Sequence, residues 1–196
     1  MQVVDGEAGV DEAGCGSLIG DLVAAAVILP LGFDLAGVND SKKLSAKRRA
    51  NVYDRVMHAA NVGIGRVSRE EIDLRSLAWA RRVVFTRALD ALPASPPTIV
   101  VDGNGFFDGY ANVPYECLVK ADSTHASVAA ASIVAKVTRD AQILTLCGEE
   151  PDVADNYGWA SNMGYPTKKH LDAIAAFGVT HHHRLSFAPC KARREA

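Results

Sequence analysis

Hydrophobic residues near the start of the chain gather in short runs that are separated by glycines and polar turns. Runs of this length, rich in valine and alanine, predict strands. Three such strands are expected, at residues 9–11, 22–29 and 62–67. Because little chain separates the first two, we expect an antiparallel meander at this end of the protein.

Helical spacing of apolar residues begins before the third predicted strand and returns after it. Ser45 begins a basic segment that predicts a helix. Ser68 and Glu71 have the S-x-x-E spacing of a capping box and predict one long helix, which the prolines within residues 93–97 end. Its apolar stripe consists of Leu77, Ala80, Val84, Ala88 and Ala91.

Two further strands are predicted at residues 98–102 and 115–120, and each leads to an acidic residue. A long helix follows, because apolar residues recur there at spacings near 3.6. They are Ala130, Ile133, Val134, Val137, Ala141 and Leu144. Lys136, Arg139 and Asp140 fall on the opposite side, and Lys136 and Asp140 are spaced for an ion pair. Thr167 is expected to cap the last helix.

Strands followed by alternating helices and strands are typical of an α/β fold with a mixed central sheet flanked by helices. The chain has 196 residues, of which 48% are hydrophobic and 22% charged, so we expect residues 1–196 to form a single domain. The longest apolar run, residues 22–31, is too short to span a bilayer, and no basic signal segment precedes it. These features predict a cytoplasmic protein without membrane attachment.

Cysteine spacing and net charge exclude other classes of protein. The four cysteines include no CxxC pair, which argues against a zinc knuckle and against a disulfide framework. A formal net charge of -2 argues against a uniformly basic surface that coats nucleic acid. It allows a local basic track beside an acidic site.

Carboxylates come at the ends of three predicted strands. Asp11 and Glu12 end the first, Asp102 ends the fourth, and Asp122 follows the fifth. Ligands collect beyond strand ends in α/β sheets, so these acids are expected to converge. Carboxylates that lie close together repel one another unless cations such as Mg²⁺ or Mn²⁺ lie between them. The pattern predicts a metal site, and the alternative interpretation is a set of separate surface acids that cap turns.

Two details of local spacing modify this picture. Adjacent residues of a regular strand face opposite sides of a sheet, so Asp11 and Glu12 need an irregular backbone to converge, which Gly14 and Gly16 can supply.

The histidines at 181–183 are consecutive, so their side chains are expected to diverge. This favours a structural or substrate-edge role over metal ligation.

Seven short segments, spread over residues 9–187, carry the most specific signal. They are GVDEAGCG (9–16), DSKKLS (40–45), VDGN (101–104), KAD (120–122), ASVAAASIVAKVTRD (126–140), GYPTKKH (164–170) and HHRLSF (182–187). Together and in this order they closely resemble ribonuclease HII, the type 2 ribonuclease H family.

The resemblance implies a ribonuclease H-like fold and endonucleolytic hydrolysis of the RNA strand in RNA/DNA hybrids, including nicking 5′ to single ribonucleotides in duplex DNA. The family's acidic active-site positions fall on Asp11, Glu12, Asp102 and Asp122. They are expected to bind two divalent cations, Mn²⁺ or Mg²⁺, and to give 3′-hydroxyl and 5′-phosphate ends. Such an enzyme, expected here as a monomer, serves RNA primer removal and ribonucleotide excision repair.

The resemblance also implies a substrate-binding set. Its positions fall on Gly14, Cys15, Gly16, Lys42, Lys43 and Tyr165. Cys15 stands where the family has arginine, which predicts weaker substrate binding or an altered junction preference with the chemistry retained. Asp21 stands where proline is usual and is interpreted as a turn residue.

Other functions fit parts of the pattern. A different two-metal nuclease or phosphotransferase would use a similar carboxylate cluster, and would not require a ribonucleotide in its substrate. Ribonuclease HIII carries an additional N-terminal substrate-binding domain, which the early position of the first acidic strand disfavours. A catalytically silent hybrid-binding module is conceivable because of the two departures, whereas the four retained carboxylates favour an active enzyme.

Overall fold

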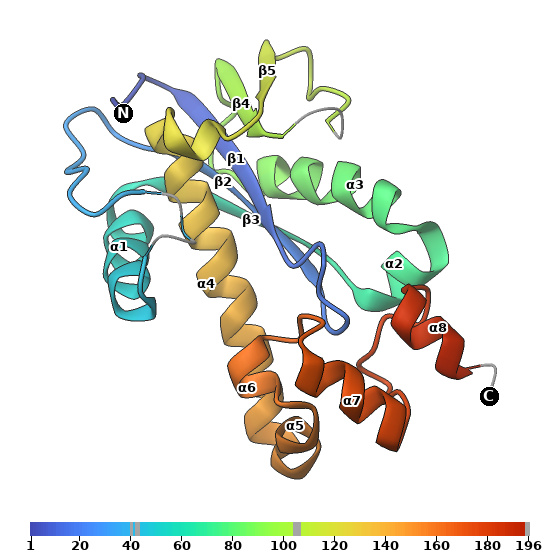
Figure 1. The fold of residues 1–196 in the computed structure, drawn as a ribbon. Helices are drawn as coiled ribbons and strands as arrows, with labels where there is room; N and C mark the ends of the chain where they lie inside the picture. The colour runs from blue at the N-terminus through green and yellow to red at the C-terminus, as the bar shows by residue number, and fades with distance from the viewer. Residues whose placement is uncertain (40, 42–43, 104–106, 195–196) are drawn as a thin grey trace.

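The structure is a computed structural model that describes residues 1–39, 41, 44–103 and 107–194 (Figure 1). A five-stranded mixed sheet lies at its centre, in the order β3-β2-β1-β4-β5. β1 (Glu7–Ala13), β2 (Leu22–Ile28) and β3 (Asn61–Val67) form the predicted antiparallel meander. β4 (Thr98–Asp102) runs parallel to β1, and β5 (Tyr115–Leu118) runs parallel to β4. The predicted α/β class is therefore confirmed.

Two strand ends differ from the prediction. β1 continues to Ala13, so Asp11 and Glu12 lie inside the strand rather than at its end, paired with Ala25 and Ala24 of β2. β5 ends at Leu118 because Lys120 adopts a left-handed backbone conformation, with φ of 61°. One turn of 3-10 helix, η2 (Ala121–Ser123), follows and carries the next acid of the site.

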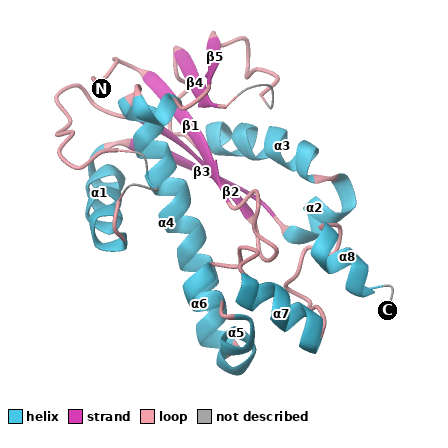
Figure 2. Cartoon of the chain, in the orientation of Figure 1, coloured by secondary structure: helices cyan, strands magenta, loops and turns pink. Residues whose placement is uncertain are grey.

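A helix covers each face of the sheet (Figure 2). α3 (Leu77–Asp90) packs on one face and α4 (Ala126–Glu149) on the other. Glycines let both helices approach closely, because a Cβ on Gly63 would lie 2.1 Å from the carbonyl oxygen of Ala88, and one on Gly9 would lie 2.1 Å from the backbone of Ser127. α1 (Ala46–Ala59), capped by Ser45 as predicted, packs beside α4.

The long helix predicted after β3 is two helices. The Ser68–Glu71 capping box is present at the start of α2 (Arg69–Arg75). Ser76 then breaks the helix with a φ of 91°, and its hydroxyl caps α3 by accepting from the amide of Trp79. The middle of the predicted stripe is buried in α3, at Ala80, Val84 and Ala88.

The second half of α4 departs from the predicted apolar face. Ala141 and Leu144 are exposed, whereas Thr138, Arg139 and Ile143 are buried. This half of α4 extends beyond the sheet and packs against the first two of the helices that follow it in the chain (Figure 1). Four helices follow α4 within the described residues. These are α5 (Pro151–Tyr157), α6 (Trp159–Asn162), α7 (Lys168–Phe177) and α8 (Ala188–Arg194). The predicted polar side of α4 is therefore partly interior, and α7, capped by Thr167 as predicted, is not the last helix.

No helix in the described ranges is long and apolar enough to cross a membrane.

Candidate active site

A cavity of about 470 Å³ lies where β1, β4, α4 and the loop after β1 meet, and we call it the carboxylate cavity. Three of the four predicted acids line it, namely Asp11, Glu12 and Asp102. The predicted substrate-binding residues Gly14, Cys15, Gly16 and Tyr165 line it as well. The structure thus brings together residues that lie up to about 150 positions apart in the chain.

Asp11 and Glu12 reach the cavity from opposite faces of β1. The Asp11 carboxylate faces Ser132 of α4, which lowers its pKa slightly, while Arg81 of α3 donates to Glu12 Oε1 at 2.8 Å. The ladder with β2 is unbroken at both acids, so the irregular backbone expected between them is absent there. It begins instead at Gly14, whose φ is +99°.

Asp11 lies in a strongly negative, desolvated environment. Burial raises its pKa well above the usual value, and the nearby charges of Glu12 and Asp102 raise it further. The amide of Glu12 donates to Asp11 Oδ1 at 2.7 Å and opposes this shift only in part. A cation between these carboxylates would offset both the desolvation and the repulsion.

Asp102 connects the cavity to η2. It is the last residue of β4, and its Oδ1 accepts a hydrogen bond from the amide of Ala121 at 2.8 Å. Asp122 follows Ala121 in the chain. It is buried, but it does not line the carboxylate cavity. The Asp102–Ala121 contact therefore brings the residue before the fourth acid against Asp102.

Two buried arginines hold the turn of residues 14–16 and the residues that follow it, a role that the sequence pattern did not predict. Arg184 donates to the carbonyl oxygens of Gly14 at 2.8 Å and of Cys15 at 3.2 Å. Arg139 donates to the Ser17 hydroxyl and to the carbonyl of Met163, two residues before Tyr165. The prediction that Arg139 lies on the polar side of its helix is wrong, because its guanidinium packs between these distant segments.

The Cys15 side chain faces the acids. Its thiol donates to Glu12 Oε1 at 3.2 Å. Burial and the charge of Glu12 raise the pKa of the thiol, so it stays protonated at neutral pH.

Lys136 and Tyr165 also line the cavity. Lys136 makes the predicted ion pair with Asp140 at 2.8 Å, yet it also lines the cavity and lies 5.3 Å from the centre of the Tyr165 ring. Arg139 lies 5.4 Å from the same ring. The two cations fix the orientation of the tyrosine.

The remaining residues named from the sequence have different outcomes. Lys42 and Lys43 fall outside the described residues, whereas the neighbouring Ser41 lines the cavity, with its hydroxyl 2.8 Å from that of Ser132. Asp21 does not line the cavity and accepts a hydrogen bond from Gln142 at 3.4 Å. Arg81 carried no sequence signal, because a charge on an amphipathic helix usually faces solvent.

Comparison with known proteins gives a consistent result. The family model described as Ribonuclease HII matches residues 8–190. A curated relative named Ribonuclease HII, from Chromohalobacter salexigens, is 46% identical over 185 residues, which cover 94% of this chain and 90% of the relative.

Two solved structures are similar as well. The ribonuclease H2 of Pyrococcus horikoshii superposes with a TM-score of 0.77 at 26% identity, over 96% of this chain and 97% of the other. Bst-RNase HIII in complex with Mn²⁺ superposes with a TM-score of 0.68 at 22% identity, over 96% of this chain and 69% of the other. The second likeness concerns the fold alone.

Proposed function

Because this chain belongs to the ribonuclease HII family and is therefore an endoribonuclease of the ribonuclease H type, we propose that Asp11, Glu12, Asp102 and Asp122 bind the divalent cations of its reaction. Three of these acids line one cavity, and the fourth follows the residue that hydrogen-bonds Asp102. The raised pKa of Asp11 supports this proposal, since a grouping that disfavours its own charge is stabilised by bound cations.

The chemistry of the donors favours Mg²⁺ or Mn²⁺. Carboxylate oxygens are hard ligands, and both ions prefer them. A protein of the same fold, Bst-RNase HIII, has a structure in complex with Mn²⁺. Two bound cations would supply an activated water and would stabilise the charge on the departing 3′ oxygen.

The substrates proposed are RNA/DNA hybrids and DNA duplexes with embedded ribonucleotides, cut to leave 3′-hydroxyl and 5′-phosphate ends. Discrimination of RNA from DNA depends on the 2′-hydroxyl, which a backbone donor or acceptor can contact directly. The turn of residues 14–16 lines the same cavity as Tyr165, with Gly16 beside the tyrosine ring, and Arg184 fixes the carbonyl groups of the turn. The turn and the tyrosine together are proposed to bind the ribonucleotide at the junction.

The whole chain is proposed to act as one catalytic unit, a cytoplasmic monomer. Lys136 is proposed to contact the substrate, because it lines the cavity while its ammonium keeps an ion pair with Asp140. Arg81 pairs with Glu12 at 2.8 Å and is proposed to compete with a bound cation for that carboxylate. Neither residue would exchange protons with the substrate.

The observation that carries the proposal is the convergence of Asp11, Glu12 and Asp102 on one cavity. The test is cleavage of a labelled DNA duplex with a single ribonucleotide, and of a long RNA/DNA hybrid, in Mg²⁺ or Mn²⁺. Asp102→Asn should abolish cleavage of both substrates. Asp108→Asn is the matched control, because the Asp108 side chain is 72% exposed and pairs with Arg82, and it should cut like the wild type.

Other outcomes separate the alternatives. Cleavage of the hybrid alone would retain the metal chemistry and indicate a changed junction preference in the turn that contains Cys15. Cleavage of a duplex without any ribonucleotide would indicate a different two-metal nuclease. Binding of the hybrid with no cleavage in either metal would indicate a silent binding module.

A further inference from the structure

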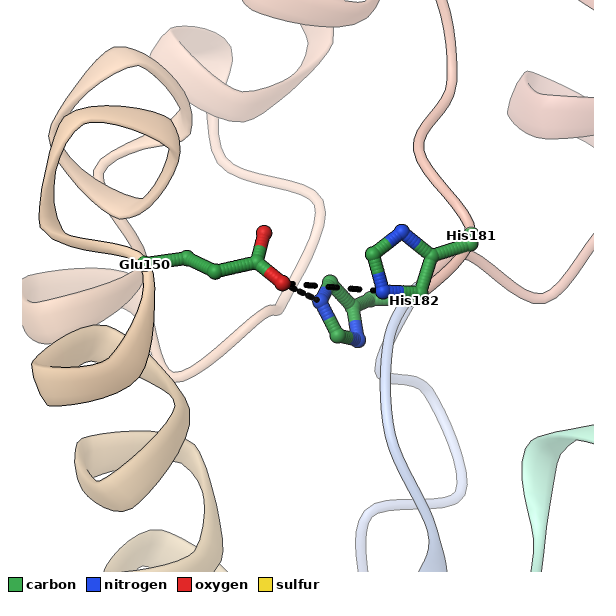
Figure 3. Close-up of side chains that lie close together, drawn as sticks. All are labelled: Glu150, His181 and His182. Carbon is green, nitrogen blue, oxygen red and sulfur yellow. Dashed lines mark hydrogen bonds and ion pairs between the residues drawn. The ribbon is translucent and has the colours of Figure 1, made fainter.

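Two of the three consecutive histidines meet a glutamate far along the chain. Glu150 lies directly after α4, and His181 and His182 lie in the loop between α7 and α8 (Figure 3). Glu150 Oε1 is 3.0 Å from His182 Nε2 and 3.6 Å from His181 Nε2. The predicted divergence is correct for His183, which is buried beside His170, and wrong for the other two.

We propose that Glu150, His181 and His182, the histidine–glutamate cluster, form a binding site for a transition-metal dication of the Zn²⁺ type. This site is separate from the carboxylate cavity and is independent of the proposed function. Each residue offers one ligand atom, and the three atoms lie within 4.8 Å of one another.

The distances agree with metal coordination. Ligands about 2.0–2.1 Å from a tetrahedral Zn²⁺ lie about 3.3 Å from one another. The two distances from Glu150 Oε1, 3.0 and 3.6 Å, bracket that value. The third separation, between the two histidine ligand atoms, lies within 4.8 Å, so binding would require the His181 ring, whose side chain is 69% exposed, to rotate toward the other two ligands.

The donor set selects the class of metal. Two imidazole nitrogens and one carboxylate oxygen suit Zn²⁺ and its neighbours in the first transition row, whereas Mg²⁺ prefers an all-oxygen shell. Three protein ligands leave a coordination position for water, which the exposure of His181 allows. The Mg²⁺ that the carboxylate cavity favours would therefore compete poorly at this cluster.

Two of the ligands are already held in place. The backbone of Glu150 links α4 to α5, since its amide donates to the Leu146 carbonyl and its carbonyl accepts from Ala154. The His182 ring packs edge-on against the buried Trp159, with ring centres 5.6 Å apart. The His182 carbonyl accepts from the amide of Gly20. A preorganised pair of ligands lowers the conformational cost of binding.

A metal at this cluster would connect the end of α4 to the loop before α8. Because the unfolded chain does not hold the three ligands together, binding would add to the stability of the folded protein. The cluster would act as a metal-dependent brace of the C-terminal helices.

The experiment measures Zn²⁺ binding by equilibrium dialysis in excess Mg²⁺, which competes with Zn²⁺ for all-oxygen sites. Asp102→Asn serves as the background in every variant, so that Zn²⁺ bound at the carboxylates is reduced. His181→Asn and Glu150→Gln should weaken Zn²⁺ binding about tenfold or more. His58→Asn removes another exposed histidine and is the matched control.

Two further readouts accompany the dialysis. Zn²⁺ should raise the Tm of the background protein and of His58→Asn, but not that of His181→Asn. Co²⁺ should give visible d–d absorption that His181→Asn lacks. Equal Zn²⁺ affinity in His181→Asn and His58→Asn would overturn the proposal and leave a hydrogen-bonded cluster only.

Discussion

The guanidinium of Arg184 donates to the carbonyl oxygen of Gly14 at 2.8 Å, across 170 positions of the chain. It also donates to the carbonyls of Cys15 and Gly20, and its side chain is fully buried. One arginine thus fixes the carbonyl side of the turn that faces the carboxylate cavity. The proposed function assigns this turn to substrate binding.

Arg184→Lys should disturb this turn, because an ammonium cannot reproduce the planar fork that reaches three carbonyls. We expect kcat/KM on a single-ribonucleotide duplex to fall about tenfold, with most of the change in KM, since a buried charged hydrogen bond is worth about 1.5–3 kcal/mol. Steady-state kinetics on that duplex measure the split. The same substitution at Arg82, which is 52% exposed, should leave both constants unchanged. A fall in kcat alone would contradict a positioning role.

The sequence predicted the parts of the fold that depend on local signals. The β-branched run of β4 ends on Asp102 as expected, and the caps at Ser45, Ser68 and Thr167 begin their helices. Each of these features involves neighbours within a few residues, so the pattern alone contains the information.

The features that were missed depend on partners far along the chain. The helical periodicity places Arg139 on the polar side of its helix. Its side chain is nevertheless 0% exposed, because Ser17, Ile19 and Met163 accept its hydrogen bonds. The break at Ser76 requires a positive φ that serine rarely adopts, so no sequence rule predicts it. The carboxylates were identified from the sequence. Their neighbours, Ser132 for Asp11 and Arg81 for Glu12, could not be predicted, because they come from helices that pack on the sheet.

Arg81 should influence how strongly the acids bind cations. Its guanidinium pairs with Glu12 at 2.8 Å, so it competes with a metal for that carboxylate and adds positive charge beside the cavity. Arg81→Gln should lower the Mg²⁺ concentration for half-maximal cleavage several-fold. A Mg²⁺ titration of activity measures this, with Arg82→Gln as the exposed control. A higher Mg²⁺ requirement would show instead that Arg81 mainly orients Glu12.

The Glu71–Arg87 pair should stabilise the protein only above strongly acidic pH. Hydrogen bonds from Arg87 and from the amide of Ser68 lower the pKa of Glu71 to about 2. Because its folded pKa is depressed, the stabilisation is present above the unfolded pKa of 4.5 and is lost as pH falls toward 2. Both side chains are over one-third exposed, so solvent screening limits the effect to less than about 1 kcal/mol.

Urea unfolding of Glu71→Gln at several pH values checks this linkage. The variant should be less stable than the wild type at pH 7, and the two curves should converge as pH falls from 4.5 toward 2. A difference that stays constant over this range would assign the loss to the capping geometry rather than to the charge.

The buried pair of His170 and His183 should make the protein sensitive to acid. Burial, and then the proximity of His170, lower the pKa of His183 to about 3. The unfolded chain binds a proton at this histidine near pH 6.5, whereas the folded chain binds it only near pH 3. The free energy of unfolding therefore falls by about 1.4 kcal/mol per pH unit for this group as pH decreases from 6.5 toward 3.

The pair also contacts the segment that lines the carboxylate cavity, because His170 Nδ1 is 3.1 Å from the carbonyl oxygen of Tyr165. His183→Gln should be less stable at pH 7 but should lose less stability on acidification, as measured by the urea midpoint between pH 7 and pH 5. His58→Gln, at an exposed position, should keep the wild-type slope. An unchanged slope in His183→Gln would contradict the linkage.

Cys15 gives the most direct test of how substrate is bound. Its thiol lies at the cavity wall, 3.2 Å from Glu12 Oε1, in a turn whose backbone Arg184 already holds. Cys15→Arg should add one phosphate contact, so substrate affinity should rise several-fold at low salt, and the slope of log affinity against log salt should steepen by about 0.9.

Cys15→Ser, which keeps the size and adds no charge, is the control and should keep the wild-type slope. Fluorescence anisotropy in Ca²⁺, on the single-ribonucleotide duplex and on the long hybrid, measures the slopes without cleavage. A steeper slope on the duplex alone would mean that residue 15 sets junction preference, whereas an unchanged slope on both would mean that the new arginine pairs with Glu12 and that this wall does not contact phosphate.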